Sequence, residues 1–154
     1  MATFSNQRIA NLWAVSNLKI WHGLYWMVAF EHEGRGDAFA LMAKVEPGSQ
    51  ITSCINDQHE VAVMLPDNVW GAARDVMTHR EEFGPLKCIT FDVALDITVS
   101  GYLKPAIERL GEAGVSVIPQ CALIYDHIFV HENDLDKAVA VLNQLQEDAV
   151  KHQL

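Results

Sequence analysis

Residues 86–130 decide the fold, and they read LKCIT FDVALDITVS GYLKPAIERL GEAGVSVIPQ CALIYDHIFV. The first segment, 86–95, is apolar and rich in β-branched and aromatic residues, which predicts a strand. A helix is expected over 102–113, followed by two strands over 115–118 and 122–130. A β-α-β-β unit with joints this short is half of a ferredoxin-like sandwich, so the sequence predicts an α+β fold.

The expected helix carries its own start and stop signals. Ser100 is a good N-cap, because its hydroxyl can accept a hydrogen bond from a free backbone N–H group of the first turn. The apolar residues Leu103, Ile107 and Leu110 recur at three- and four-residue steps, which places them on one face. Gly114 stands where a helix favours a terminating residue in the left-handed conformation.

The rest of the chain shows further patterns of the same kinds. An alternation of apolar residues over 19–30 predicts a strand, and Asn133 is expected to cap a C-terminal helix that continues to at least residue 145. The other expected elements are a short helix ahead of residue 17, a helix or a strand over 38–45, a hairpin over 51–55 and 60–65, and a helix over 69–80. A polar link over 81–85 then leads into the central stretch, so the sequence predicts a segment over 1–17 and two units over 18–85 and 86–154.

The composition excludes several functional classes. The 154 residues carry a formal net charge of −9 and no basic cluster, which argues against a nucleic-acid-binding surface. The longest uninterrupted apolar run, Leu24–Phe30, is far shorter than the roughly 20 residues that a membrane helix needs, and the N-terminus lacks the pattern of a signal peptide. We therefore expect a cytoplasmic protein with no membrane partner.

The cysteine pattern predicts neither disulfides nor a zinc site. Cys54, Cys88 and Cys121 contain no CxxC pair, so they are expected to be buried thiols. The triplet 31–33 (EHE) resembles half of a zinc or deaminase signature, but the paired cysteines that would complete it are missing, and an exposed loop is expected there. No cofactor, metal or catalytic residue is predicted.

Three segments of the chain resemble the pattern of ACT domains. They are the turn 100–103 (SGYL), the helix end 110–117 (LGEAGVSV) and the strand 125–130 (YDHIFV). More closely, the chain resembles the small bacterial tandem-ACT proteins related to the CASTOR amino-acid sensors. Residues 18–28 and 51–63 also fit that family, so the resemblance spans about residues 18–145.

This resemblance implies two ferredoxin-like ACT units packed side by side, an N-terminal ACT-like unit over 18–85 and a C-terminal ACT domain over 86–154. The usual role of the family is to bind an amino acid or a related small metabolite, here between the two halves, and to report it to a partner without catalysis. A homodimer is expected on the same ground.

The resemblance also implies a ligand site at the turn before the helix. Backbone N–H groups are unpaired at such a turn and carry partial positive charge, which suits a carboxylate, and a glycine lets the ligand approach closely. Asp126 stands where the family has an acidic residue that could meet an amino or guanidino group. The implied ligand-binding residues are Ser100, Gly101, Tyr102, Leu103, Val115, Ser116, Ile118 and Asp126.

One departure from the family leaves the identity of the ligand open. Residues 121–125 read CALIY where the family often has a polar run, so this wall of the site would be more apolar. Two other functions use the same fold, a ligand-free interaction or dimerisation module and a small enzyme. A buried apolar side chain that fills the turn at 100–103 would favour the interaction module, whereas titratable groups clustered in one cleft would favour the enzyme.

Overall fold

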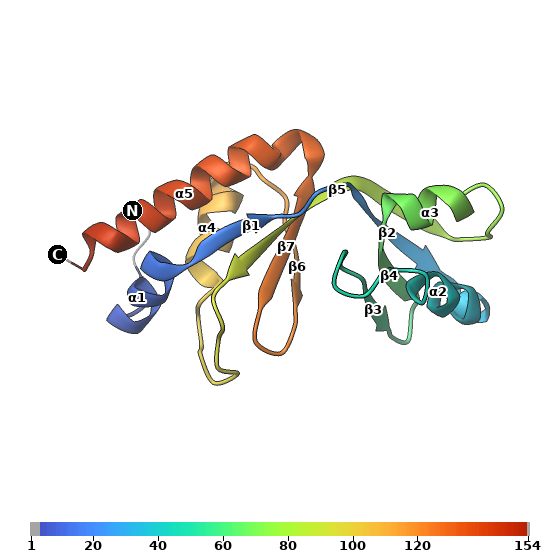
Figure 1. Cartoon of the computed structure of the whole chain (residues 1–154), viewed down its shortest axis with the longest axis horizontal. Coiled ribbons are helices and arrows are strands. Elements are labelled where there is room, and N and C mark those ends of the chain that lie inside the picture. Colours follow the sequence, from blue (N-terminus) through green and yellow to red (C-terminus); the bar gives the residue numbers. More distant parts are fainter. Residues whose placement is uncertain (1–3, 154) are drawn as a thin grey trace. The chain divides into compact units, whose positions relative to one another are not determined.

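The computed structural model describes residues 4–153, which form two compact units (Figure 1). We call Trp21–Lys87 the central unit, and Met1–Ile20 together with Cys88–Leu154 the terminal unit. The sequence predicted a separate segment over 1–17 and a boundary between residues 85 and 86. The observed boundary lies two residues further on, and residues 4–20 belong with the C-terminal half rather than standing apart.

The central unit has a complete β-α-β-β-α-β connectivity. Its strands lie in the order β3-β4-β2-β5, and β4 and β5 both pair antiparallel with β2. This is the connectivity of a ferredoxin-like sandwich. The elements are β2 (Tyr25–Phe30), the 3-10 helix η1 (His32–Gly34), α2 (Arg35–Met42), β3 (Ser53–Asn56), β4 (Val61–Pro66), α3 (Asp67–Ala73) and the first part of β5 (Glu81–Asp92).

The terminal unit has the same connectivity, but one of its strands comes from the start of the chain. Its strands lie in the order β1-β5-β7-β6, and β1 pairs antiparallel with the second part of β5, from Asn17 opposite Asp92 to Ile20 opposite Ile89. β1 therefore takes the place of the fourth strand, which explains why residues 4–20 join this unit. The elements are α1 (Gln7–Val15), β1 (Asn17–Ile20), α4 (Lys104–Glu112), β6 (Ile118–Cys121), β7 (Asp126–His131), the 3-10 helix η2 (Glu132–Asp134) and α5 (Leu135–Lys151).

Each unit has a hydrophobic core of its own. In the central unit, the buried rings of Phe30 and Trp70 meet edge to face with their centroids 6.1 Å apart. In the terminal unit, Trp13 contacts Phe91 and Tyr102, with ring centroids 5.2 Å and 5.0 Å away, and α1 and α4 both pack against α5 (Figure 1). None of the helices formed by residues 4–153 is long and apolar enough to cross a membrane.

Most of the expected elements are present. The helix ahead of residue 17, the helix before Gly114, the hairpin and the C-terminal helix are confirmed as α1, α4, β3 with β4, and α5. Gly114 has a φ of +73°, as predicted for the residue that ends the helix. The segment 38–45, for which both a helix and a strand were considered, belongs mainly to α2.

Several expected boundaries were wrong. The polar link over 81–85 is the first part of β5, because these residues pair with β2. The single strand expected over 19–30 is two strands, because the chain turns at Gly23, whose φ is +81°. The two strands expected after α4 begin three and four residues later than predicted, at Ile118 and Asp126, and α3 ends at Ala73 instead of residue 80.

Two predicted helix caps were also wrong. The helix expected from residue 102 begins at Lys104, and its N-cap position is held by Leu103 instead of Ser100, since Pro105 suits the first turn. At the other helix, Asn133 lies inside η2, two residues before α5 begins at Leu135, and Asp134 holds the N-cap position.

Candidate functional site

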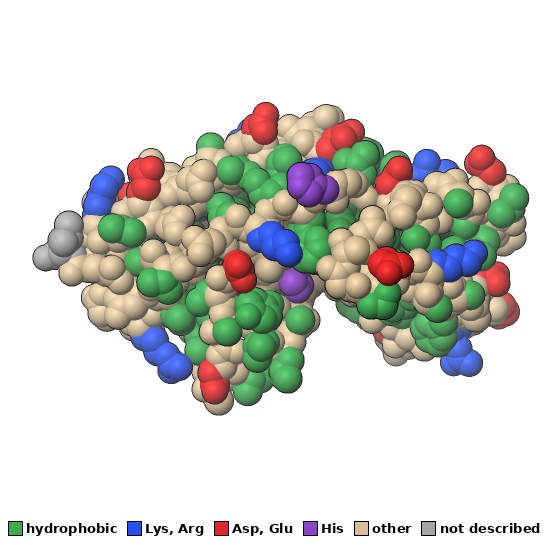
Figure 2. Space-filling model, in the orientation of Figure 1, with side chains coloured by type: hydrophobic (Ala, Val, Ile, Leu, Met, Phe, Trp, Pro, Cys, Tyr) green, Lys and Arg blue, Asp and Glu red, His purple; other side chains and the backbone are tan. Residues whose placement is uncertain are grey.

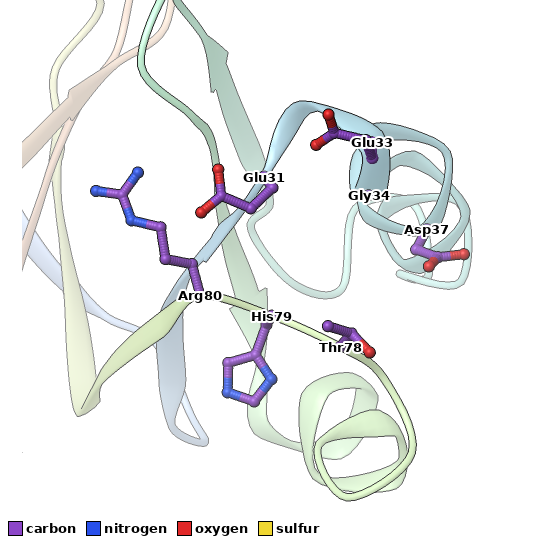
Figure 3. Close-up of a pocket in the computed structure, with 7 residues that line it drawn as sticks. All are labelled: Glu31, Glu33, Gly34, Asp37, Thr78, His79 and Arg80. Carbon is purple, nitrogen blue, oxygen red and sulfur yellow. The ribbon is translucent and has the colours of Figure 1, made fainter.

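A cavity of about 480 Å³ opens in the central unit beside the turn between β2 and α2 (Figure 3). One wall is formed by this turn and the start of α2, and the other by the segment that leads into β5. Its volume falls within the roughly 300–1,000 Å³ that small-molecule sites occupy. The lining residues are Glu31, Glu33, Gly34, Asp37, Thr78, His79 and Arg80.

Backbone hydrogen bonds hold both walls of this cavity. The Gly34 N–H group donates to the Glu31 carbonyl at 2.9 Å and closes the turn, and the Arg80 N–H group donates to the Ala29 carbonyl at 2.8 Å. A Cβ atom at Gly34 would lie only 3.3 Å from the ring of Phe30, which is fully buried. The glycine therefore lets the turn pack directly on the core of the central unit.

The cavity carries an excess of negative charge. Glu31, Glu33 and Asp37 are all exposed, and Glu33 and Asp37 lie in the first turns of η1 and α2, where the helix dipole favours a carboxylate. The facing wall contains Arg80, whose Nη2 lies 3.4 Å from the Glu60 carboxylate and whose Nη1 donates to the His59 carbonyl at 3.3 Å, so that its guanidinium points away from Glu33 and Asp37 (Figure 3). A wall with three carboxylates suits a ligand that carries ammonium groups.

These carboxylates do not converge on a metal site. Across residues 4–153, no group of three or more His, Cys, Asp or Glu side chains is arranged to hold a metal ion. Metal ligands must all lie within about 2–2.6 Å of one ion, whereas an ammonium-bearing molecule can meet carboxylates that stand further apart. The cavity therefore suits an organic cation better than an inorganic one.

The carboxylate of Glu82 supports the wall of the cavity that contains His79. Glu82 Oε2 accepts hydrogen bonds from Trp70 Nε1 at 2.6 Å and from Arg74 Nε at 3.1 Å, and it lies 3.7 Å from His79 Nε2. The His79 ring stands edge-on to Trp70, with the centroids 4.9 Å apart. These contacts fix the position of the wall that contains His79.

The site residues predicted from the sequence lie in the terminal unit, and several of them belong to its core. Tyr102 is only 2% exposed, its ring stacks on Trp13, and its hydroxyl lies 2.6 Å from Ser16 Oγ. Burial raises the pKa of Tyr102 by more than the Ser16 hydroxyl lowers it. Leu103 packs against the same core and Val115 is buried in it, so these side chains offer little surface to a ligand.

The other predicted residues are at least partly exposed: Ser100, Gly101, Ser116, Ile118 and Asp126. Gly101 has a φ of +84°, which glycine adopts without strain. Partial desolvation and a hydrogen bond to the Asp126 carboxylate raise the pKa of the Cys121 thiol to about 11, and the Asp126 charge adds to the raised pKa of Tyr102. Cys121 is exposed, and of the three cysteines expected to be buried only Cys88 is.

A backbone hydrogen bond joins the loop and the turn that carry the predicted site residues. The Leu95 N–H group donates to the Ile124 carbonyl at 2.8 Å, which ties the loop before α4 to the turn before β7. The terminal unit has its own cavity of about 460 Å³ between α4 and α5, lined by residues such as Arg109 and Gln144. None of the predicted site residues lines this cavity or that of the central unit.

The sequence reasoning missed the cavity of the central unit because it treated 31–33 as an exposed loop. The signal that could have found it is the order of the elements. Residues 31–34 connect the first strand of the central unit to its first helix, which is the position that 93–103 holds in the terminal unit. The second wall, at 78–80, comes from the far end of the unit's sequence and has no local signal.

Solved structures share this fold at low sequence identity. A Vibrio cholerae protein of unknown function, described as a possible transport protein, matches 94% of this chain and 99% of its own with a TM-score of 0.70 and 18% identity. A protein from Agrobacterium tumefaciens matches 85% of this chain and 89% of its own with a TM-score of 0.63 and 19% identity. The regulatory subunit of aspartate kinase from Thermus thermophilus matches 84% of this chain and 97% of its own with a TM-score of 0.59 and 7% identity.

No protein-family model matches the sequence, and no curated protein is a significant sequence match. At identities of 7% to 19% the structural likeness concerns the fold alone. The chain therefore has an ACT-like α+β fold, as the resemblance of its sequence implied.

Proposed function

We propose that the protein is a non-enzymatic regulatory protein that binds a cationic amino acid in the cavity of the central unit. The observation that carries this proposal is the group of three carboxylates that lines the cavity at the strand-to-helix turn and the start of α2. A free amino acid carries an ammonium and a carboxylate, and lysine or arginine adds a second cation that matches the excess of acid. The fold that the chain shares with a regulatory subunit of aspartate kinase supports the regulatory part of the proposal.

In the proposed complex, Glu33 and Asp37 accept hydrogen bonds from the ammonium groups and Arg80 donates to the carboxylate. A hydrogen bond to a charged group contributes about 1.5–3 kcal/mol, and these groups should lie at the lower end because they are exposed to water and salt. Arg80 must give up its contact with Glu60 and its hydrogen bond to the His59 carbonyl in order to bind, which lowers its net contribution. We therefore expect micromolar to millimolar affinity.

The proposal assigns no chemical step to any residue. Partial desolvation of the thiol and the neighbouring Asp126 carboxylate raise the pKa of Cys121 to about 11, which opposes formation of the thiolate that a nucleophile needs. We also propose a cytoplasmic location, since all three cysteines are free thiols, as in a reducing compartment. We also propose that the protein is a homodimer, on the ground of the sequence resemblance.

Isothermal titration calorimetry and thermal shift with each standard amino acid test the binding. Lysine or arginine at about 100 times its dissociation constant should raise the free energy of unfolding by about 2.7 kcal/mol, which shifts the midpoint by several degrees. Asp37→Asn should weaken binding about tenfold. The matched control is Asp136→Asn, which neutralises an exposed acid in the first turn of α5 and should leave binding unchanged.

Two results would contradict this proposal. The first is a midpoint that no amino acid moves, and the second is equal binding by Asp37→Asn and Asp136→Asn. The burial of Tyr102 and Val115 favours a second function, a protein-interaction module, for the terminal unit. In that case the midpoint should respond to a protein partner and to no amino acid.

A further inference from the structure

Two neighbouring turns of the terminal unit expose large aliphatic side chains. Ile97 is 75% exposed, Leu123 is 74% exposed and Ile124 is 45% exposed. Turns usually carry small or polar residues such as Gly, Asn, Asp and Ser. Three large aliphatic side chains at two joined turns therefore need an explanation other than the formation of the turns.

Hydrogen bonds fix the first turn. The Asp96 carboxylate accepts from the Thr98 N–H group at 2.8 Å and from the Thr98 hydroxyl at 2.5 Å. The Val99 N–H group donates to the Asp96 carbonyl at 2.8 Å, which closes the turn around Ile97. Ile97 is thus held outward by an ordered backbone.

The second turn is fixed in the same way and is joined to the first. The Ala122 N–H group donates to the Tyr125 carbonyl at 2.9 Å, which leaves Leu123 and Ile124 at the tip. The Ile124 carbonyl accepts from Leu95, the residue that precedes the first turn. We call Ile97, Leu123 and Ile124 the aliphatic patch, and this hydrogen bond links its two turns.

Acidic residues border the aliphatic patch. Asp96 directly precedes Ile97, and the hydrogen bonds from Thr98 hold the pKa of Asp96 below its usual range, so it is charged at neutral pH. Asp126 follows the second turn and is partly exposed. Figure 2 shows apolar side chains gathered over this part of the terminal unit with acidic side chains beside them.

The acidic residues beside the aliphatic patch distinguish among three surfaces that could cover it: a second copy of the chain, an anionic membrane and a basic partner protein. A second copy would bring its own acids against these, and like charges across an interface oppose association. A membrane with anionic lipids would repel them for the same reason, and the whole chain adds a net charge of −9. A basic partner gains attraction from the same groups.

We propose that the aliphatic patch is a docking surface for a basic segment of a partner protein that has one apolar face. The three aliphatic side chains contact the apolar face, and Asp96 and Asp126 meet Lys or Arg side chains at its edge. The surface is already ordered, so docking costs little conformational entropy on this side of the interface. This inference does not depend on the cavity of the central unit.

The test uses a fluorescently labelled synthetic peptide of leucine and lysine in an amphipathic helical order, titrated with the full chain and followed by anisotropy. Binding should saturate, and the triple variant Ile97→Ser, Leu123→Ser, Ile124→Ser should weaken it about tenfold or more. The control is Val76→Ser in the central unit, since Val76 is 83% exposed and lies outside the patch. Asp96→Asn keeps the acceptor for Thr98, removes the charge, and should reduce the dependence of binding on salt.

A peptide with glutamate in place of lysine should not bind. Four results would overturn the proposal: no binding of the lysine peptide, equal binding by the triple variant, preferential binding of the chain to phosphatidylcholine–phosphatidylglycerol vesicles, or self-association that the triple variant abolishes in sedimentation. Circular dichroism checks that each variant is folded. If the triple variant is not, Leu123→Ser alone should still weaken binding measurably.

Discussion

Tyr102 has a structural role in the fold, whereas the sequence resemblance implied a ligand-binding role for it. Its carbonyl accepts a hydrogen bond from Trp13 Nε1 at 2.8 Å, and its ring stacks on the same tryptophan. The Ser16 hydroxyl donates to the Leu12 carbonyl at 2.7 Å, so the Tyr102 hydroxyl is the donor in its bond to Ser16. Tyr102 thus attaches the turn before α4 to α1.

The Tyr102→Phe variant tests this role through its dependence on pH. At neutral pH it should lower the free energy of unfolding by about 1 kcal/mol, because one buried hydrogen bond is lost. Burial raises the pKa of Tyr102 in the folded state above its unfolded value of about 10. The stabilisation from this raised pKa is present below pH 10 or so and is lost as the pH rises further, since the unfolded chain then releases the proton more readily.

The wild-type protein should therefore lose stability more steeply than Tyr102→Phe above a pH of about 10. Urea unfolding of both proteins at a pH of about 8 and of about 11 measures the two slopes. Lysine and the other tyrosines titrate in both proteins, so their effects cancel in the difference. Parallel loss of stability would mean that the Tyr102 hydroxyl is not buried in solution.

Among the elements, β1 has the largest consequence for the fold. It supplies the fourth strand of the terminal unit, and α1 brings the fully buried Trp13 into that unit's core. Removal of residues 1–20 would expose one edge of β5 and open the core, and deletion of one large buried aromatic alone costs about 3–5 kcal/mol. We expect this truncation to unfold the terminal unit.

Hydrogen exchange measures this effect element by element. In the truncated chain the backbone amides of β7 should lose their protection, whereas those of β4 in the central unit should keep most of theirs. β4 serves as an internal control within the same molecule. Full protection of β7 after the truncation would show that β1 is dispensable and that the unit is complete without it.

The sequence predicted elements with local signals better than it predicted pairings between distant segments. The apolar steps of α4 and the terminator Gly114 lie next to each other in the chain, so they could be recognised. The pairing of β1 with β5 joins segments that are far apart in the chain, and neither segment has a local sequence signal that predicts it. The polar residues at 81–85 form a strand only because β2 lies beside them.

The same reasoning explains the outcome for the candidate site. A turn between a strand and a helix could be predicted at 100–103, but burial of Tyr102 depends on α1, which is far away in the sequence. The cavity of the central unit has Glu31 on one wall and Arg80 on the other, and only the folded unit brings them together. Its residue types were visible in the sequence, and their proximity was not.

At the scale of the whole molecule, the chain uses one connectivity twice and thereby makes two strand-to-helix turns. In the central unit this turn borders a cavity, whereas in the terminal unit side chains of the corresponding turn are packed into the core. The two turns thus differ in the space beside them. If the two turns serve different purposes, we expect the proposed ligand beside the turn of the central unit, where the cavity lies.

This assignment predicts where a ligand should change hydrogen exchange. With lysine or arginine at saturating concentration, amides over 31–37 and 78–80 should gain protection, because a bound ligand suppresses local opening. Amides over 96–103 should be unchanged. At a ligand concentration near the wild-type dissociation constant, the Asp37→Asn variant should show a much smaller gain, while Asp136→Asn behaves like the wild type. Protection gained over 96–103 would instead assign the ligand to the turn that the sequence resemblance implied, and the open cavity of the central unit would then need another role.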